Sequence, residues 1–171
     1  MNNAGRSAGG RIEQITDQTW TGDLELKLLG AIRATRLVLP HLRAAGGGSI
    51  LNVLAVAAKS PGAGSMPSST SRAAGMAMTK ALSKELGPDQ IRVNAVLIGV
   101  IESGQWVRRA EESGRTVEQV YAELVTAGDI PLGRVGRSSE FADLAAFLLS
   151  DRASYLTGAA INLDGGASPV S

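Results

Sequence analysis

The chain has 171 residues, of which 44% are apolar, so it is long enough to form one domain with a hydrophobic core. Lys and Arg total 17 against 16 Asp and Glu, and a net charge of +1 argues against a nucleic-acid-binding or membrane-binding surface. The absence of cysteine excludes disulfides and thiolate chemistry, and a single histidine, His41, without clustered acids gives no metal site. No apolar run reaches the ~18 residues of a membrane span and no secretory signal is visible, so we expect a cytoplasmic protein.

The first two-thirds of the sequence predicts helices and strands in alternation. Apolar residues at helical spacing predict a helix over residues 23–43, which the glycine run at residues 46–48 ends. A buried strand is expected over residues 49–56, followed by a helix over residues 69–86. Residues 91–100 are apolar enough for a strand that is covered on both faces.

The last third continues the alternation. Residues 103–128 predict a helical flap that Gly114 interrupts, and residues 138–149 predict an amphipathic helix. Residues 159–163 read as a short closing strand. Because strands and helices alternate, we expect parallel pairing with right-handed crossovers, that is, an open α/β sheet in a single domain over residues 1–171.

Several short motifs resemble landmarks of the short-chain dehydrogenase/reductase family, in that family's usual order. They are Asn-Asn-Ala-Gly at residues 2–5, Ile-Arg-Val-Asn-Ala-Val at 91–96, Pro-Leu-Gly-Arg at 131–134, Tyr-Leu-Thr-Gly at 155–158 and Asp-Gly-Gly at 164–166. The resemblance covers essentially the whole chain. It implies the C-terminal part of a Rossmann-like, doubly wound parallel sheet with flanking helices.

The family elements that would precede Asn2 have no counterpart in this sequence. They are the first three strands, the glycine-rich turn that holds a pyrophosphate and the residue that reads the ribose. The glycine run at residues 46–48 does not replace that turn, because it precedes a strand; residues 5–10 are better placed, either for a phosphate or as a rim loop. The resemblance therefore implies NAD(P), weakly bound without the missing half, against Asn2, Ala4, Gly5, Gly99, Ile101 and Ser103.

The four catalytic positions of the family carry other residues in this chain. Counted from Thr79 and Lys80, the tyrosine position is Ser68 and the lysine position is Arg72. The resemblance maps the serine to Ala55 and, seven residues past Trp20, the asparagine to Lys27.

These substitutions change the available chemistry. A phenol has a pKa near ~10 that a cation can lower, whereas the hydroxyl of Ser68 is far less acidic. Arg72 can bind an anion but cannot shuttle protons, because a guanidinium keeps its charge. Ala55 offers no hydrogen bond, and Lys27 adds a charge where the relay uses a neutral amide.

Other residues give alternative readings of the site. Tyr121 in the flap and Tyr155 do not match the tyrosine position, and the run of Ser and Thr over residues 68–71 is read as a helix cap. Ser68 and Arg72 share a helix face and, with Lys27, form either a positive pocket for a small anionic molecule or a solvated helix face. Arginine at the lysine position also resembles the halohydrin dehalogenases, whose serine and tyrosine are missing here.

Three functional hypotheses follow. The first is a degenerate, non-catalytic relative that binds a small molecule or acts as a partner subunit, associating as a homo-oligomer or hetero-oligomer through the helices at residues 23–43 and 69–86. The second is an NAD(P)-dependent oxidoreductase with an atypical active site, whose N-terminal cofactor-binding half is missing from this sequence. The third is a lyase or isomerase that stabilises an anion with Lys27, Ser68 and Arg72.

Overall fold

The computed structural model describes all 171 residues and centres on a parallel sheet of three strands in the order β2-β4-β5. The strands are β2 (Gly48–Ala55), β4 (Ile91–Ile98) and β5 (Ala160–Leu163). Ile50 of β2 is in register with Val93 of β4, and Val96 of β4 with Ile161 of β5. This arrangement confirms the open α/β sheet that the alternating elements predict.

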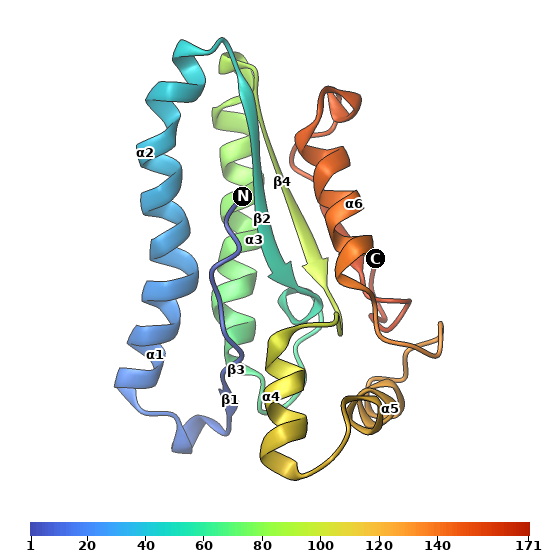
Figure 1. The fold of residues 1–171 in the computed structure, drawn as a ribbon. Helices are drawn as coiled ribbons and strands as arrows, with labels where there is room; N and C mark the ends of the chain where they lie inside the picture. Colours follow the sequence, from blue (N-terminus) through green and yellow to red (C-terminus); the bar gives the residue numbers. More distant parts are fainter.

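Helices cover both faces of the sheet (Figure 1). On one face lie α2 (Gly30–Ala44) and α3 (Ser68–Glu85), and on the other lies α6 (Ser138–Leu149). Successive side chains of a strand point to opposite faces, so Leu51 packs against α6 while Leu54 packs against α3. Both faces of β2 and β4 are therefore buried, as their continuous apolar runs predict.

The long helix predicted over residues 23–43 is longer and less regular than expected. It begins as α1 (Asp17–Leu24), passes through a π-helical segment at Glu25–Leu29 and continues as α2. Thr16 caps its start, because the Thr16 hydroxyl accepts a hydrogen bond from the Thr19 backbone N–H. The π segment was not predicted, since nothing in a periodic apolar pattern distinguishes a local i→i+5 turn.

The flap predicted over residues 103–128 consists of two helices, α4 (Gly104–Ser113) and α5 (Val117–Ala127). Gly114 ends α4 in the left-handed conformation at φ +65°, which a glycine adopts without strain. Both helices lie beyond the carboxyl ends of β2 and β4 in Figure 1. They close off the end of the sheet at which ligands bind in open α/β folds.

The N-terminal segment runs beside β2 without forming a full strand. Asn2 makes one parallel bridge to Asn52, and its side-chain amide donates to the Asn52 side-chain oxygen at 2.8 Å. Farther along, β1 (Gly9–Gly10) pairs antiparallel with β3 (Met66–Pro67). The loop before β1 is thus held over the start of α3.

Candidate active site

A cleft of about 820 Å³ opens at the carboxyl ends of β2 and β4. The N-terminal loop, the start of α3 and the flap contribute its walls, and the ends of the two strands its floor. Three of the four mapped catalytic positions line it, namely Ala55, Ser68 and Arg72. The fourth, Lys27, lies behind Ser68 and lines a smaller cavity of about 380 Å³, which Arg72 also borders.

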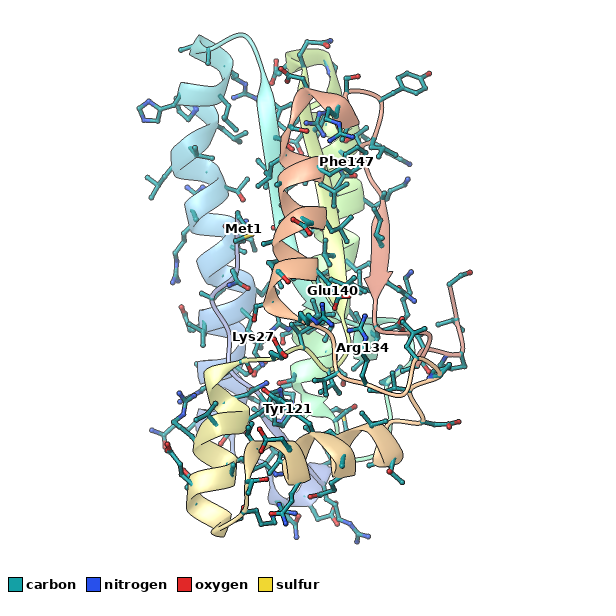
Figure 2. All side chains as sticks on the ribbon, turned by 45° about the vertical axis from the view of Figure 1, so that its right-hand side comes forward. Met1, Lys27, Tyr121, Arg134, Glu140 and Phe147 are labelled. Carbon is teal, nitrogen blue, oxygen red and sulfur yellow. The ribbon has the colours of Figure 1, made fainter.

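Lys27 is a buried cation in the π-helical segment. Its Nζ donates to the carboxylate of Asp23, one turn earlier, and both side chains are 2% exposed. In Figure 2 Lys27 is labelled on the side of the α1–α2 helix, above the flap. π turns are frequent at functional sites, and here the turn carries a charged side chain inward.

Burial lowers the pKa of Lys27, because a charged ammonium loses its hydration. Asp23 opposes this effect by favouring the charged form, while the nearby Arg72 and Arg6 lower the pKa further. The result is an ammonium group that releases its proton more readily than an exposed lysine does. It is also held in contact with the cleft through a single hydroxyl.

That hydroxyl is Ser68 Oγ, which Lys27 Nζ contacts at 2.5 Å. Ser68 Oγ also accepts a hydrogen bond from the Ala8 backbone N–H at 3.0 Å. A hydroxyl has two acceptor sites and one proton, so both acceptor sites are used and the proton remains to be donated. Ser68 Oγ donates that proton to the Asp23 carboxylate over a long distance of 3.4 Å. A ligand oxygen in the cleft would have to replace Asp23 as its acceptor.

Asp23 is held in place by a second serine. Ser71 Oγ donates to the Asp23 carboxylate at 2.6 Å, and both residues are buried. These contacts join the start of α3, through Ser68 and Ser71, to the continuous α1–α2 helix, through Asp23 and Lys27. This arrangement fixes the position of the Lys27 ammonium behind Ser68.

Arg72 lies one turn after Ser68 on α3 and is half-buried. One of its terminal nitrogens donates to the Val53 carbonyl at 2.5 Å, and Arg72 forms no ion pair. Burial lowers its pKa and Asp23 partly offsets this effect. At Gly5 an added Cβ would lie 2.8 Å from the other terminal nitrogen, so the N-terminal loop runs directly against the guanidinium.

The residues predicted to contact a nicotinamide cofactor divide between two places. Gly5, Gly99, Ile101 and Ser103 line the main cleft. Asn2 and Ala4 line the smaller cavity instead, and Asn2 bonds to Asn52. The cleft lies outside the carboxyl ends of parallel strands and has an apolar wall from Ile98 to Ile101, which suits a flat nicotinamide ring.

Neither tyrosine supplies a phenol to the cleft. Tyr155 is fully exposed, and Tyr121 is absent from the cleft lining. Burial, followed by the negative charges of Glu102 and Glu118, raises the pKa of Tyr121, which makes it a weaker acid. His41 lies in the last turn of α2, away from the cleft, and no group of three potential metal ligands occurs in the chain.

Sequence reasoning did not identify Asp23, Ser71 or Arg6 as site residues. The spacing of Asp23 and Lys27, four residues apart, was the available signal for the ion pair. Ser71 is adjacent to Arg72 but was read as part of a helix cap. Arg6 lines the cleft from the N-terminal loop, and no local sequence pattern predicts the path of that loop.

Comparison with known proteins places this chain in a family. The family model described as enoyl-(acyl carrier protein) reductase matches residues 1–168. A 3-oxoacyl-[acyl-carrier-protein] reductase of Thermotoga maritima is 34% identical over 166 residues, which are 97% of this chain and 64% of the relative. The chain therefore belongs to the short-chain dehydrogenase/reductase family, and it spans less than two thirds of that relative's length.

Solved structures agree with this assignment. A short-chain oxidoreductase of Pseudomonas aeruginosa, described as containing an atypical catalytic center and solved with NADPH, matches with a TM-score of 0.91 and 35% identity. The match covers 99% of this chain and 65% of that one. L-sorbose reductase of Gluconobacter frateurii, solved with NADPH and L-sorbose, matches with a TM-score of 0.93 and 29% identity. This match covers 99% of the present chain and 66% of the reductase chain. None of the helices in the present chain has the length and apolar character needed to cross a bilayer.

Proposed function

We propose that this chain is the substrate-side part of an NAD(P)-dependent oxidoreductase in which a lysine and a serine replace the tyrosine of the family. The observation that carries the proposal is the contact between the buried Lys27 ammonium and the cleft-facing Ser68 hydroxyl. The sequence alone favours a non-catalytic role, because it shows that the phenol is missing but not that a lysine lies behind Ser68. The atypical catalytic center ascribed to the Pseudomonas aeruginosa relative supports the same direction.

A reduced nicotinamide, when bound, supplies a hydride to a carbonyl carbon. The residues of this chain provide the proton. The carbonyl oxygen accepts a hydrogen bond from Ser68, takes the Ser68 proton as charge develops on it, and Ser68 recovers a proton from Lys27. The lowered pKa of Lys27 favours this direction of transfer, and the smaller cavity beside Lys27 offers a path for its reprotonation.

The pair does not favour the opposite assignment, a serine nucleophile with a lysine base. A lysine base must be neutral, and although burial lowers the pKa of Lys27, the Asp23 carboxylate that contacts it directly favours the charged form. Both acceptor sites of Ser68 are also engaged by N–H donors, which weakens it as a nucleophile. Proton donation is the chemistry that this arrangement favours.

The experiment measures oxidation of NADPH, NADH and reduced nicotinamide mononucleotide by this chain with a panel of ketones and aldehydes. The mononucleotide is included because the cleft residues lie on the nicotinamide side, so it tests the site without the first half of the fold. We expect carbonyl-dependent oxidation that falls roughly 10²- to 10⁴-fold in Lys27→Met, the usual range for loss of a general acid. Ser68→Ala, which is a smaller structural change, should reduce the oxidation rate by a similar factor.

The rival is the non-catalytic binding role. The specific observation in its favour is that no phenol lines the cleft. The reductase proposal is contradicted if the parent chain oxidises every donor no faster than Lys27→Met does. The same holds if this result persists when the chain is extended by a nucleotide-binding half, and the binding role then remains.

A further inference from the structure

Three arginines that line the cleft have no ion-pair partner in the protein. Six ion pairs occur in the chain, and none involves Arg6, Arg72 or Arg108, all three of which line the cleft. A positive charge that is partly removed from water is costly unless an anion accompanies it. This cost falls on Arg72, which is half-buried, whereas Arg6 and Arg108 are exposed. Glu102 is the one acid in the cleft lining, and it forms no ion pair with any of the three arginines.

Three of the cations gather around a single carboxylate. Arg6 and Arg72 lie close enough to Lys27 to influence its charge, and Asp23 is the one acid that contacts this group. Arg6 also reaches α1, where its terminal nitrogen lies 4.0 Å from a Cβ built on Gly22. This group carries three positive charges against one negative charge, and its members Lys27 and Asp23 contact the Ser68 hydroxyl.

Arg72 is oriented for recognition rather than for an internal bond. Its bond to the Val53 carbonyl anchors one edge of the guanidinium, and the side-chain-free Gly5 lets the loop pass the other terminal nitrogen. The donors that Val53 does not use are left for a ligand. A planar guanidinium matches the two oxygens of a carboxylate, with which it can form paired hydrogen bonds.

From these contacts we propose that the substrate is an oxo acid, a carbonyl compound bearing a carboxylate that Arg72 and Arg6 bind while Ser68 donates to its carbonyl oxygen. The word substrate rests on the proposed reductase function, whereas the anion site itself does not. The rest of the cleft suits the remainder of such a molecule, since Val53, Ala55, Val56 and Ile101 give it an apolar surface. The carboxylate therefore sets orientation and the apolar wall accepts the carbon chain.

The first test measures binding by calorimetry with this chain alone, without cofactor. The probes are 2-, 3- and 4-oxo acids of increasing chain length, each compared with its own methyl ester, which keeps the carbonyl and removes the charge. We expect at least one acid to bind roughly ten-fold or more tightly than its ester, as a charge-assisted hydrogen bond provides, and to weaken with added salt. Equal affinities for every acid and its ester would overturn the proposal.

Matched variants assign the effect to the two arginines. Arg6→Gln and Arg72→Gln should reduce acid affinity toward that of the ester, whereas ester binding should persist and shows that the variant is folded. Arg36→Gln, an exposed α2 position outside the cleft, serves as the control and should bind like the parent. Acid binding that survives Arg6→Gln and Arg72→Gln unchanged contradicts the assignment.

The two proposals fail in different ways. If the acids bind through Arg6 and Arg72 but no nicotinamide is oxidised, the anion site stands and the reductase falls. If neutral ketones are reduced while acids and esters bind alike, the reductase stands and the oxo-acid specificity falls.

Discussion

At the scale of single residues, the buried pair of Asp23 and Lys27 determines both stability and chemistry. Two charges removed from water compensate one another, and removing one partner leaves the other without compensation. Lys27→Met should lower the free energy of unfolding by about 3–5 kcal/mol, the typical cost of breaking a buried ion pair. Denaturant unfolding monitored by circular dichroism measures this loss.

A double-mutant cycle separates the pair from other effects. Asp23→Asn alone also breaks the pair. Lys27→Met combined with Asp23→Asn removes both charges, and the Asn side-chain oxygen can still accept the hydrogen bond from Ser71. We expect the double variant to lose clearly less than the sum of the single losses. Strict additivity would mean that Asp23 and Lys27 do not interact in the folded chain.

Gly5 gives a second prediction at this scale. A Cβ at residue 5 would meet the Arg72 terminal nitrogen at 2.8 Å, and the flexible guanidinium would move away. Gly5→Ala should therefore weaken oxo-acid binding with little change in the unfolding midpoint. Gly62→Ala is the matched control, because a Cβ there meets nothing within 4 Å, and its binding should equal that of the parent.

At the scale of elements, one carboxylate joins the loop before α6 to the start of that helix. Glu140 accepts two hydrogen bonds from Arg134, at 2.6 Å and 2.9 Å, and one from the Arg137 backbone N–H at 2.7 Å. Figure 2 shows the labels of Glu140 and Arg134 close together. The Arg134 bonds, followed by the Arg137 bond, lower the pKa of Glu140 from 4.5 to about 2.

This shift predicts a dependence of stability on pH. Because the folded-state pKa lies below the unfolded value, the stabilising contribution is complete above about pH 4.5 and is lost as pH falls through about 2. Glu140→Gln should be less stable than the parent at pH 6, and the difference should shrink between pH values of about 4.5 and 2. Denaturant unfolding across this range measures it.

Glu112→Gln is the control for that series. Glu112 is exposed on α4 and forms no ion pair, so its replacement should leave the pH profile of stability unchanged. A difference between the parent and Glu140→Gln that stays constant down to pH 2 would mean that the Glu140 carboxylate is not stabilised by Arg134 and Arg137.

The elements themselves were largely predictable, and the site was predictable only in part. Strands with continuous apolar runs, such as Ile91–Ile98, and the helix at Ser138–Leu149 follow from periodicity because burial on both or one face imposes it. The π segment at Glu25–Leu29 does not follow from periodicity, since one extra residue in a helical turn leaves no distinct apolar pattern. The sequence placed Lys27 beside Ser68 and Arg72 as one of two readings, but it did not predict that Lys27 would be buried against Asp23.

At the scale of the whole molecule, contacts between distant segments explain what the sequence did not reveal. Ser68 was judged too weak an acid because an aliphatic hydroxyl is far less acidic than a phenol. In the fold, however, Lys27, 41 positions away, contacts it directly. Arg6 reaches the same place through a loop that the β1–β3 pairing holds. A motif map supplies the positions of a site, but the partners of each position depend on tertiary packing.

The outer surface of α2 leads to a prediction about assembly. Leu37 is 75% exposed, and Val38 and Leu26 on the same continuous helix are each 38% exposed. Apolar side chains this exposed on one helix are typical of a contact with another subunit. The predicted association through the helices at residues 23–43 and 69–86 uses this surface.

Leu37→Glu should therefore shift the chain toward monomer, because a carboxylate at the centre of an apolar contact loses its hydration without gaining a partner. Light scattering coupled to size-exclusion chromatography measures the mass of parent and variant at matched concentrations. Val107→Glu, a similar change at a 45% exposed position on α4, controls for added charge and should leave the mass unchanged. A parent that is already monomeric, or a variant with the parent's oligomeric mass, would show that this face of α2 is not the contact.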